Sequence, residues 1–230
     1  MEILKLMKKL KLLSALLIFC CVHSQTKKCE NLVVFGNTSI CLPEVIGITE
    51  CYKEPMVKMT ADLFKGTASE EILGFYISDD EYDDLYNSLM DKGLQKEFIK
   101  IYSTSLVKNY NVSNDEFNKF SSGIKSMFDE YEGSKIQSKI NSKMESLNLS
   151  AGRPVLLDEY QINSKIKSFI ALMKYKFESE NIISLMVMNV LLVKDRLIFI
   201  AYYDKYSNFD QIEKLRAKND YFLLSLLNLN

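Results

Sequence analysis

The most apolar part of the chain lies near its C-terminus, where two hydrophobic runs flank a short charged segment. Residues 182–193 and 197–203 are almost entirely apolar, and three charged residues at 194–196 separate them. β-branched and aromatic residues are common in both runs, and each run has the length of a strand. We therefore predict two β-strands joined by a tight turn.

Alternate positions of the first run are apolar on both sides. One side carries Ile183, Leu185, Val187 and Leu191, and the other carries Ile182, Met186, Met188 and Val190. A strand with two apolar faces sits at the centre of a sheet that is covered on both sides. Residues 181–204 are also long enough to span a bilayer, but three charges would then fall near mid-membrane at a cost of about 2.5–3.5 kcal/mol each. The pair of strands is the favoured interpretation.

The rest of the pattern predicts further strands and helices around this pair. Strand-like runs cover residues 31–35, 39–42, 56–64, 71–78, 98–106 and 165–177. Apolar residues recur at helical spacing after the acidic residues 79–84 and after the capping box that begins at Ser113. They do so again at 136–147 and at 209–227, and Ser207 or Asn208 is expected to cap the last helix. The loop signal at 148–154 does not separate a second domain. We predict one α+β domain over residues 25–230, an antiparallel sheet of about five to seven strands with helices packed on it and the C-terminal helix over a central β-hairpin.

Residues 1–24 read as a signal peptide. Four lysines precede a short apolar run at 12–22, and cleavage after Ser24 would leave Gln25 as the first residue. The apolar run is shorter than the roughly 20 residues that a membrane span requires. We therefore predict an exported chain, periplasmic or secreted, without an integral membrane span after cleavage. A retained anchor, or a lipid on Cys20 or Cys21, is the less favoured alternative.

The net charge of the chain limits the classes of partner that we expect. The whole chain has a net charge of −1, and removal of residues 1–24 takes away four lysines and one glutamate, which leaves a net charge of −4. A nucleic-acid-binding surface or an anionic membrane would call for a basic chain. We expect an unidentified protein or small-molecule partner and no nucleic acid.

The single histidine, His23, lies within the predicted signal peptide. Without it, Ser-His-Asp and Cys-His catalysis and histidine-ligated metals are excluded for the processed chain. Paired carboxylates or a lysine could still support catalysis, so an enzyme is disfavoured but not excluded. We expect no cofactor and no metal ion.

Three cysteines, Cys29, Cys41 and Cys51, follow the signal. In an oxidising compartment any two of them can pair. Cys29 and Cys41 flank the predicted hairpin around Gly36 and Asn37, so a bridge between them would staple it. Three free thiols are the alternative, and a cysteine-only metal site is improbable because closed sites use four ligands.

Two clusters are candidate binding sites. The acidic run 79–84 could hold a hard cation, but it lacks the alternating spacing of a calcium loop and fits the start of a helix better. Tyr202, Tyr203 and Tyr206 gather where the last strand ends and could bind a sugar or aromatic ligand; packing at the sheet rim is the alternative.

The C-terminal third resembles the end of PsbP-like α+β domains. The similar residues are the hairpin at 183–206, ISLMVMNVLLVKDRLIFIAYYDKY, and the helix at 208–229, NFDQIEKLRAKNDYFLLSLLNL; ICLPEV and EILGFYIS are loosely similar to the opening strands. The resemblance implies an antiparallel sheet under a C-terminal helix, in a small accessory or binding module without catalysis. The whole chain also looks like uncharacterised exported proteins of Bacteroidetes-type bacteria.

These observations favour an exported, non-catalytic binding or accessory protein of the periplasm or cell exterior. The first alternative is a carboxylate-dependent hydrolase that uses the acids at 79–84. The second is an envelope-anchored structural protein. Two carboxylates that face each other across a cleft would favour the hydrolase.

Overall fold

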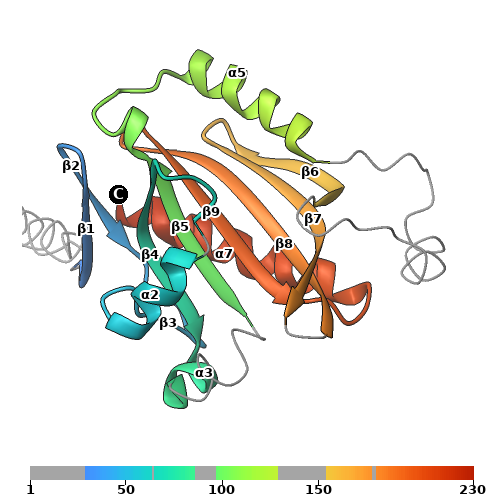
Figure 1. Ribbon diagram of the computed structural model, residues 1–230. Helices are drawn as coiled ribbons and strands as arrows, with labels where there is room; N and C mark the ends of the chain where they lie inside the picture. Colours follow the sequence, from blue (N-terminus) through green and yellow to red (C-terminus); the bar gives the residue numbers. More distant parts are fainter. Residues whose placement is uncertain (1–28, 64, 86–96, 129–153, 178–179) are drawn as a thin grey trace, which may run out of the picture.

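A computed structural model describes residues 29–63, 65–85, 97–128, 154–177 and 180–230 (Figure 1). Within these residues the chain forms a seven-stranded antiparallel sheet in the order β3-β4-β5-β9-β8-β7-β6, and a separate two-stranded hairpin, β1-β2. The strands are β1 (Asn31–Phe35), β2 (Thr38–Leu42), β3 (Ile48–Glu50), β4 (Glu70–Ser78), β5 (Phe98–Thr104), β6 (Val155–Asn163), β7 (Ile166–Phe177), β8 (Glu180–Val193) and β9 (Arg196–Lys205). The helices are α2 (Pro55–Leu63), α3 (Asp79–Asp83), α5 (Asn114–Ile124) and α7 (Asp210–Leu229), with short 3₁₀ turns η1 (Ser105–Val107) and η2 (Lys125–Met127). The predicted α+β class is confirmed.

The two predicted C-terminal strands, β8 and β9, lie in the middle of the sheet. They pair continuously from Ser184 and Lys205 to Val193 and Arg196. The two residues between them, Lys194 and Asp195, have φ angles of 48° and 61°, as a two-residue type I′ hairpin turn requires. The alternative of one membrane-spanning segment is therefore wrong, because these residues form two paired strands. Among the described residues, no helix combines the length and the apolar character needed to cross a bilayer.

The two faces of β8 are buried under different elements. Leu185, Val187 and Leu191 belong to a core that also contains the buried side of α7, whereas Met186 and Val190 pack in a core with α5. Figure 1 shows α7 behind the sheet and α5 and α2 in front of it. The predicted two-sided burial is thus confirmed, with the C-terminal helix over the central hairpin.

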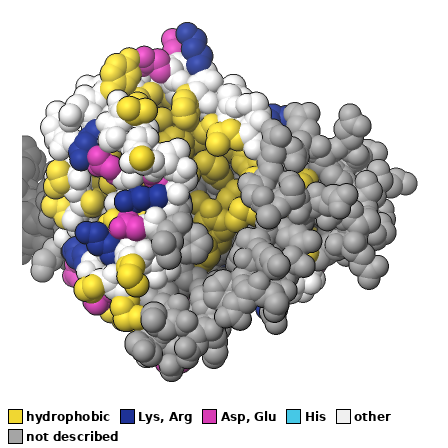
Figure 2. Space-filling view, in the orientation of Figure 1, with side chains coloured by type: hydrophobic (Ala, Val, Ile, Leu, Met, Phe, Trp, Pro, Cys, Tyr) yellow, Lys and Arg dark blue, Asp and Glu magenta, His cyan; other side chains and the backbone are white. Residues whose placement is uncertain are grey.

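The front of the sheet is lined by apolar side chains. α5 begins with the predicted capping box: the Ser113 hydroxyl accepts from the Glu116 amide at 3.3 Å, and the Glu116 carboxylate accepts from the Ser113 amide at 2.9 Å. The helix buries Phe117 and Ile124 over the sheet. Figure 2 shows hydrophobic side chains in a hollow at the middle of this face, with most charged side chains on the surface around it.

Polar contacts fix α7 on the sheet as well. Asn189 of β8 and Asn219 of α7 are both fully buried, and each side-chain amide donates to the other's oxygen, at 2.7 and 3.1 Å. Asn189 also accepts from the Ser168 hydroxyl at 2.7 Å and donates to the carbonyl of Ile200 at 3.1 Å. This buried pair sets both the position of α7 along the sheet and its rotation, because amide bonds are directional.

The β1-β2 hairpin is built around Gly36, as predicted, and the Cys29–Cys41 disulfide is confirmed with a Cα–Cα distance of 5.7 Å. Gly36 has a φ of +63°, and a Cβ there would overlap the carbonyl oxygen of Lys108. Only glycine fits this close approach.

The buried guanidinium of Arg196 joins three segments that are distant in sequence. It donates to the Thr38 hydroxyl at 3.0 Å, to Asn111 at 2.7 Å and to Asn37. The hairpin tip, the start of β9 and the segment before α5 are thereby held together. A charged group buried in this way needs such partners, because each one offsets part of the cost of removing it from water.

Several predicted elements differ from the structure. Residues 56–64 were expected as a strand, but Pro55–Leu63 is helix α2, with Val57 and Ala61 buried one turn apart. Strand β6 was not expected. No side-chain cap is made at the start of α7; instead, the Gln211 side chain accepts from the amide and hydroxyl of Ser207. The helix expected at 136–147 and almost all of the loop at 148–154 lie outside the described residues.

Candidate functional site

A groove runs along the outer side of α7, between this helix and the segment that connects β2 to β3. Three neighbouring hollows of about 310, 180 and 590 Å³ make up this α7 groove, and adjacent hollows share lining residues. Its helix side is formed by Gln211, Lys218, Tyr221, Ser225 and Leu229, which lie on one face of α7 at spacings of seven, three, four and four. The opposite wall is residues 42–48.

The largest hollow is acidic. Asp79, Asp80, Glu97 and Asp204 line it together with Lys205 and Lys218. Lys218 forms an ion pair with Glu97 at 2.5 Å, and among the described lining residues four carboxylates face two lysines. The excess of carboxylates suits a cationic group.

The negative charge of Glu97 acts on Asp204 in this hollow. Asp204 is half-buried, and burial together with the negative charge of Glu97 raises the pKa of its carboxyl above the usual value. One oxygen of Asp204 accepts from the Gln211 amide at 2.7 Å. Asp204 is therefore held in place, and its ionised form is less favourable than that of a carboxylate in water.

The middle hollow joins apolar and polar walls. Val45 and Ile46 line it from the loop side, and Tyr202 and Tyr221 line it from the sheet and the helix. The Tyr202 hydroxyl donates to Glu97, and burial followed by this contact raises the pKa of Tyr202. Ile46 is 98% exposed, which is unusual for so large an apolar side chain.

The third hollow, at the C-terminal end of α7, carries a second pair of acids. Glu30 and Glu44 line it, and no other charged side chain is among its described lining residues. A hydrogen bond between the two carboxyl groups, and the charge of Glu30, raise the pKa of Glu44. Both ends of the α7 groove therefore hold neighbouring carboxylates.

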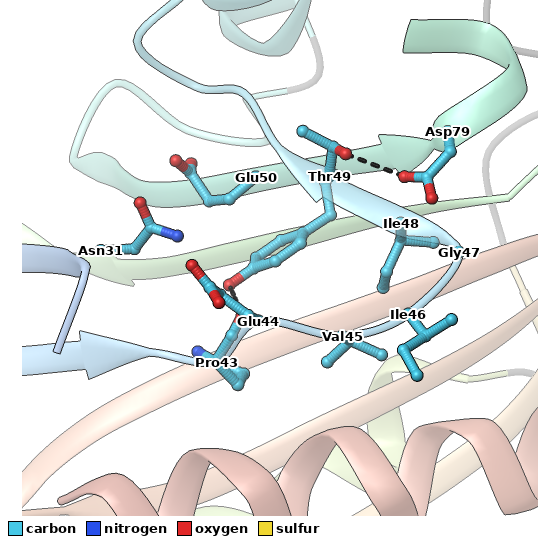
Figure 3. Close-up of a pocket in the computed structure, with 11 residues that line it drawn as sticks. Asn31, Pro43, Glu44, Val45, Ile46, Gly47, Ile48, Thr49, Glu50 and Asp79 are labelled. Atoms are coloured by element: carbon cyan, nitrogen blue, oxygen red, sulfur yellow. Dashed lines mark hydrogen bonds between the residues drawn. The ribbon is translucent and has the colours of Figure 1, made fainter. Parts of the chain in front are cut away.

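A fourth hollow of about 310 Å³, the loop pocket, lies on the other side of the same connecting segment (Figure 3). Within it the buried Tyr76 hydroxyl donates to the Pro43 carbonyl at 2.8 Å, and the Thr49 hydroxyl donates to Asp79 at 2.8 Å. In Figure 3, Val45 and Ile46 extend from this segment toward α7 at the bottom of the view. The polar groups of the loop pocket hold the wall of the α7 groove in place.

The structure separates the three tyrosines proposed as a binding cluster. Tyr202 lines the α7 groove, whereas Tyr203 points to the opposite face of the sheet and stacks on Phe98 with ring centroids 4.5 Å apart. Tyr206 is buried in the core under α7, and its hydroxyl has no hydrogen-bond partner in the described part of the chain. Successive side chains of a strand alternate between faces, so adjacent tyrosines do not share one site.

The acidic run 79–84 is also divided. Asp79 and Asp80 line the groove, but Glu81 is buried and accepts from the Ser78 hydroxyl at 3.1 Å. The expected helix start is confirmed as α3, although Ser78 rather than an aspartate is at the N-cap position. Within the described ranges, no group of three His, Cys, Asp or Glu side chains is placed to hold a metal ion.

Sequence reasoning did not find Glu97, Lys218 or the loop at 43–47 as site residues, because nothing in the sequence places them side by side. The predicted cleavage residues Ser24 and Gln25 lie outside the described residues. No protein-family model matches the chain, and no curated protein is significantly similar to it. The resemblance to PsbP-like domains therefore stays a prediction.

Proposed function

We propose that this chain is an exported protein of the periplasm or cell exterior that binds a partner in the α7 groove without catalysing a reaction on it. The observation that carries the proposal is the groove itself, which is long, open and lined by polar groups that already have partners. Glu97 is engaged by Tyr202 and Lys218, and Asp204 by Gln211. Groups held in this way offer a fixed pattern of charge for recognition.

Export is supported by the Cys29–Cys41 disulfide, which closes the hairpin next to the groove. Disulfides persist in oxidising compartments and are rare in the cytosol. The bond agrees with the basic and apolar pattern of residues 1–24, which is typical of a signal peptide.

A carboxylate-dependent hydrolase is the second candidate, and one observation favours it. Glu97 and Asp204 line the same hollow, and the pKa of Asp204 is raised by burial and by the charge of Glu97. A carboxyl group with a raised pKa beside a second carboxyl group is a pattern found in acid and base catalysis. The engagement of Glu97 by a lysine and a tyrosine argues against this role, because it leaves that carboxylate little freedom to act on a substrate.

The proposal is tested by exporting the full chain from a bacterial host and measuring its intact mass. A periplasmic or secreted product that begins at Gln25 and contains one disulfide supports it. A cytosolic product with residues 1–24 retained would contradict export, and an added lipid mass would favour the envelope-anchored alternative. Turnover of chromogenic glycosides or esters that Glu97→Gln and Asp204→Asn both abolish would favour the hydrolase.

A further inference from the structure

We propose that the occupant of the α7 groove is an extended polypeptide segment with a basic residue toward each end and an apolar residue between them. This inference rests on the proposed binding function and names the chemistry of the partner. Its basis is the order of groups along the groove, which runs acidic, apolar, acidic.

Charge complementarity sets the two ends. At one end Glu30 and Glu44 are exposed neighbours, and none of the described residues that line their hollow is basic. At the other end carboxylates outnumber lysines among the lining residues that the structure describes, and Lys218 is already paired with Glu97. A lysine or arginine side chain at either end would relieve the repulsion between like charges.

The centre of the groove calls for an apolar side chain. Ile46 and Tyr221 are 98% and 58% exposed, and both line the middle hollow. Large apolar side chains this exposed beside a hollow are typical of interaction sites. An apolar residue of the partner would lie between them and bury both.

The opposite wall offers two backbone donors. Val45 is bridged to Ile48, but within the described residues the amides of Ile46 and Gly47 donate no hydrogen bond. They are accessible beside the groove and can pair with the carbonyl groups of an extended chain. This need for backbone partners favours a polypeptide over a polyamine of the same charge.

Length leads to the same class of partner. Gln211 and Leu229, at the two ends of the groove, are 18 positions apart on α7, which corresponds to about 27 Å along a helix at about 1.5 Å per residue. An extended chain covers this distance with about eight residues at about 3.3 Å each. A single small molecule would fill one hollow and leave the others empty.

The test uses the full exported protein and three fluorescein-labelled octapeptides in a fluorescence anisotropy titration. The first is Lys-Ser-Ser-Leu-Leu-Ser-Ser-Lys, whose side chains come in the same order from either end, so a peptide bound in either direction presents the same basic and apolar groups. The second replaces both lysines with glutamate, and the third replaces both leucines with serine. We expect the first peptide to bind at least tenfold more tightly than either of the others, and to weaken as salt is added.

Two variants locate the contact. Glu30→Gln with Glu44→Gln removes one acidic end, and Ile46→Ser removes the apolar contact; all three side chains are exposed, so the fold is retained. Each variant should weaken binding of the first peptide at least fivefold. The matched controls are Glu213→Gln and Leu106→Ser, at exposed positions outside the groove, and these should not change the affinity.

The outcomes separate the two proposals. If the three peptides bind equally well, or if the glutamate or serine peptide binds best, the proposed basic and apolar character of the partner is overturned. The groove remains a binding site in that case if Ile46→Ser abolishes the binding. Binding that no groove variant changes would overturn the location. Absence of binding by all three peptides would overturn the inference, whereas the intact-mass experiment still decides export independently.

Discussion

The buried pair formed by Asn189 and Asn219 gives the most direct test of how α7 is held. Asn219→Ala removes the two hydrogen bonds to Asn189 and one to the Tyr160 hydroxyl. The partners keep other contacts: Asn189 still accepts from Ser168 and donates to Ile200, so no buried group is left without a bond. At about 1 kcal/mol net for each lost bond and about 1 kcal/mol for the small cavity, we expect a loss of about 3–4 kcal/mol.

A double-mutant cycle isolates the contribution of the pair. Asn189→Ala breaks the same two bonds as Asn219→Ala, so the double variant loses them only once. Its destabilisation should be smaller than the sum of the two single effects by about 1–2 kcal/mol.

The assay is urea denaturation followed by circular dichroism, and the control is Asn228→Ala, an exposed position on the same helix. The control should change the free energy of unfolding by less than about 0.5 kcal/mol. If the two single effects add within that margin, or if Asn219→Ala is as mild as the control, the amide pair does not hold α7 and the reasoning is refuted.

Three further predictions concern the hairpin and the groove. Gly36→Ala should destabilise the fold by more than about 2 kcal/mol in thermal denaturation, because its backbone has a positive φ and a Cβ has no room; an unchanged midpoint would contradict this. Replacing Cys29 and Cys41 by serine should cost about 3 kcal/mol in denaturant unfolding, and the unfolded, unreduced protein cleaved after Ser24 should show one reactive thiol, Cys51, where three would disprove the bridge. Asp204→Asn should raise the unfolding free energy at pH 7, because the raised pKa of the native carboxyl makes its ionisation unfavourable to folding. The gain should fade as the pH falls through the raised native pKa toward 3.8 and be absent well below 3.8, where the wild-type carboxyl is protonated in both states; a gain that persists there would refute the charge argument.

The sheet core could be predicted because its signal is local. The runs that became β8 and β9 are apolar at nearly every position that meets a covering helix, Asn189 being the exception, and the charged pair Lys194 and Asp195 marks the turn between them. The same holds for Ser113, whose capping box depends only on a residue three positions away. Such local patterns predict the structure correctly because the tertiary contacts favour the same elements.

The errors have physical causes as well. Val57 and Thr60 favour strands, but Pro55 at the first helical position and the spacing of Val57 and Ala61 are the signals of helix α2. Strand β6 is an edge strand with exposed polar positions and two register shifts, and its only apolar run, residues 155–157, is shorter than a typical strand. Charged and irregular edges prevent pairing with other chains, and the same features hide the strand in the sequence.

The α7 groove could be predicted only in part. Asp79 and Asp80 stood out as part of an acidic run, and Tyr202 as part of a tyrosine cluster, but each group was expected to form a site by itself. The structure instead takes two aspartates from one group and one tyrosine from the other and adds residues such as Glu97. No local pattern carries this combination, because the strand order β3-β4-β5-β9 alone brings these segments together.

The inner and outer faces of α7 depend on each other. Lys218 and Tyr221 reach the groove only because their neighbours Asn219 and Phe222 are turned into the core. Apolar contacts alone are not directional and would tolerate a small rotation of the helix. The amide pair with Asn189 does not tolerate such a rotation, since both of its hydrogen bonds form only at one rotation of α7 and one position of the helix along the sheet. A substitution at Asn219 should therefore alter the shape of the α7 groove, although this side chain does not line it. The groove depends on a polar residue at this core position, because that residue fixes the rotation of α7.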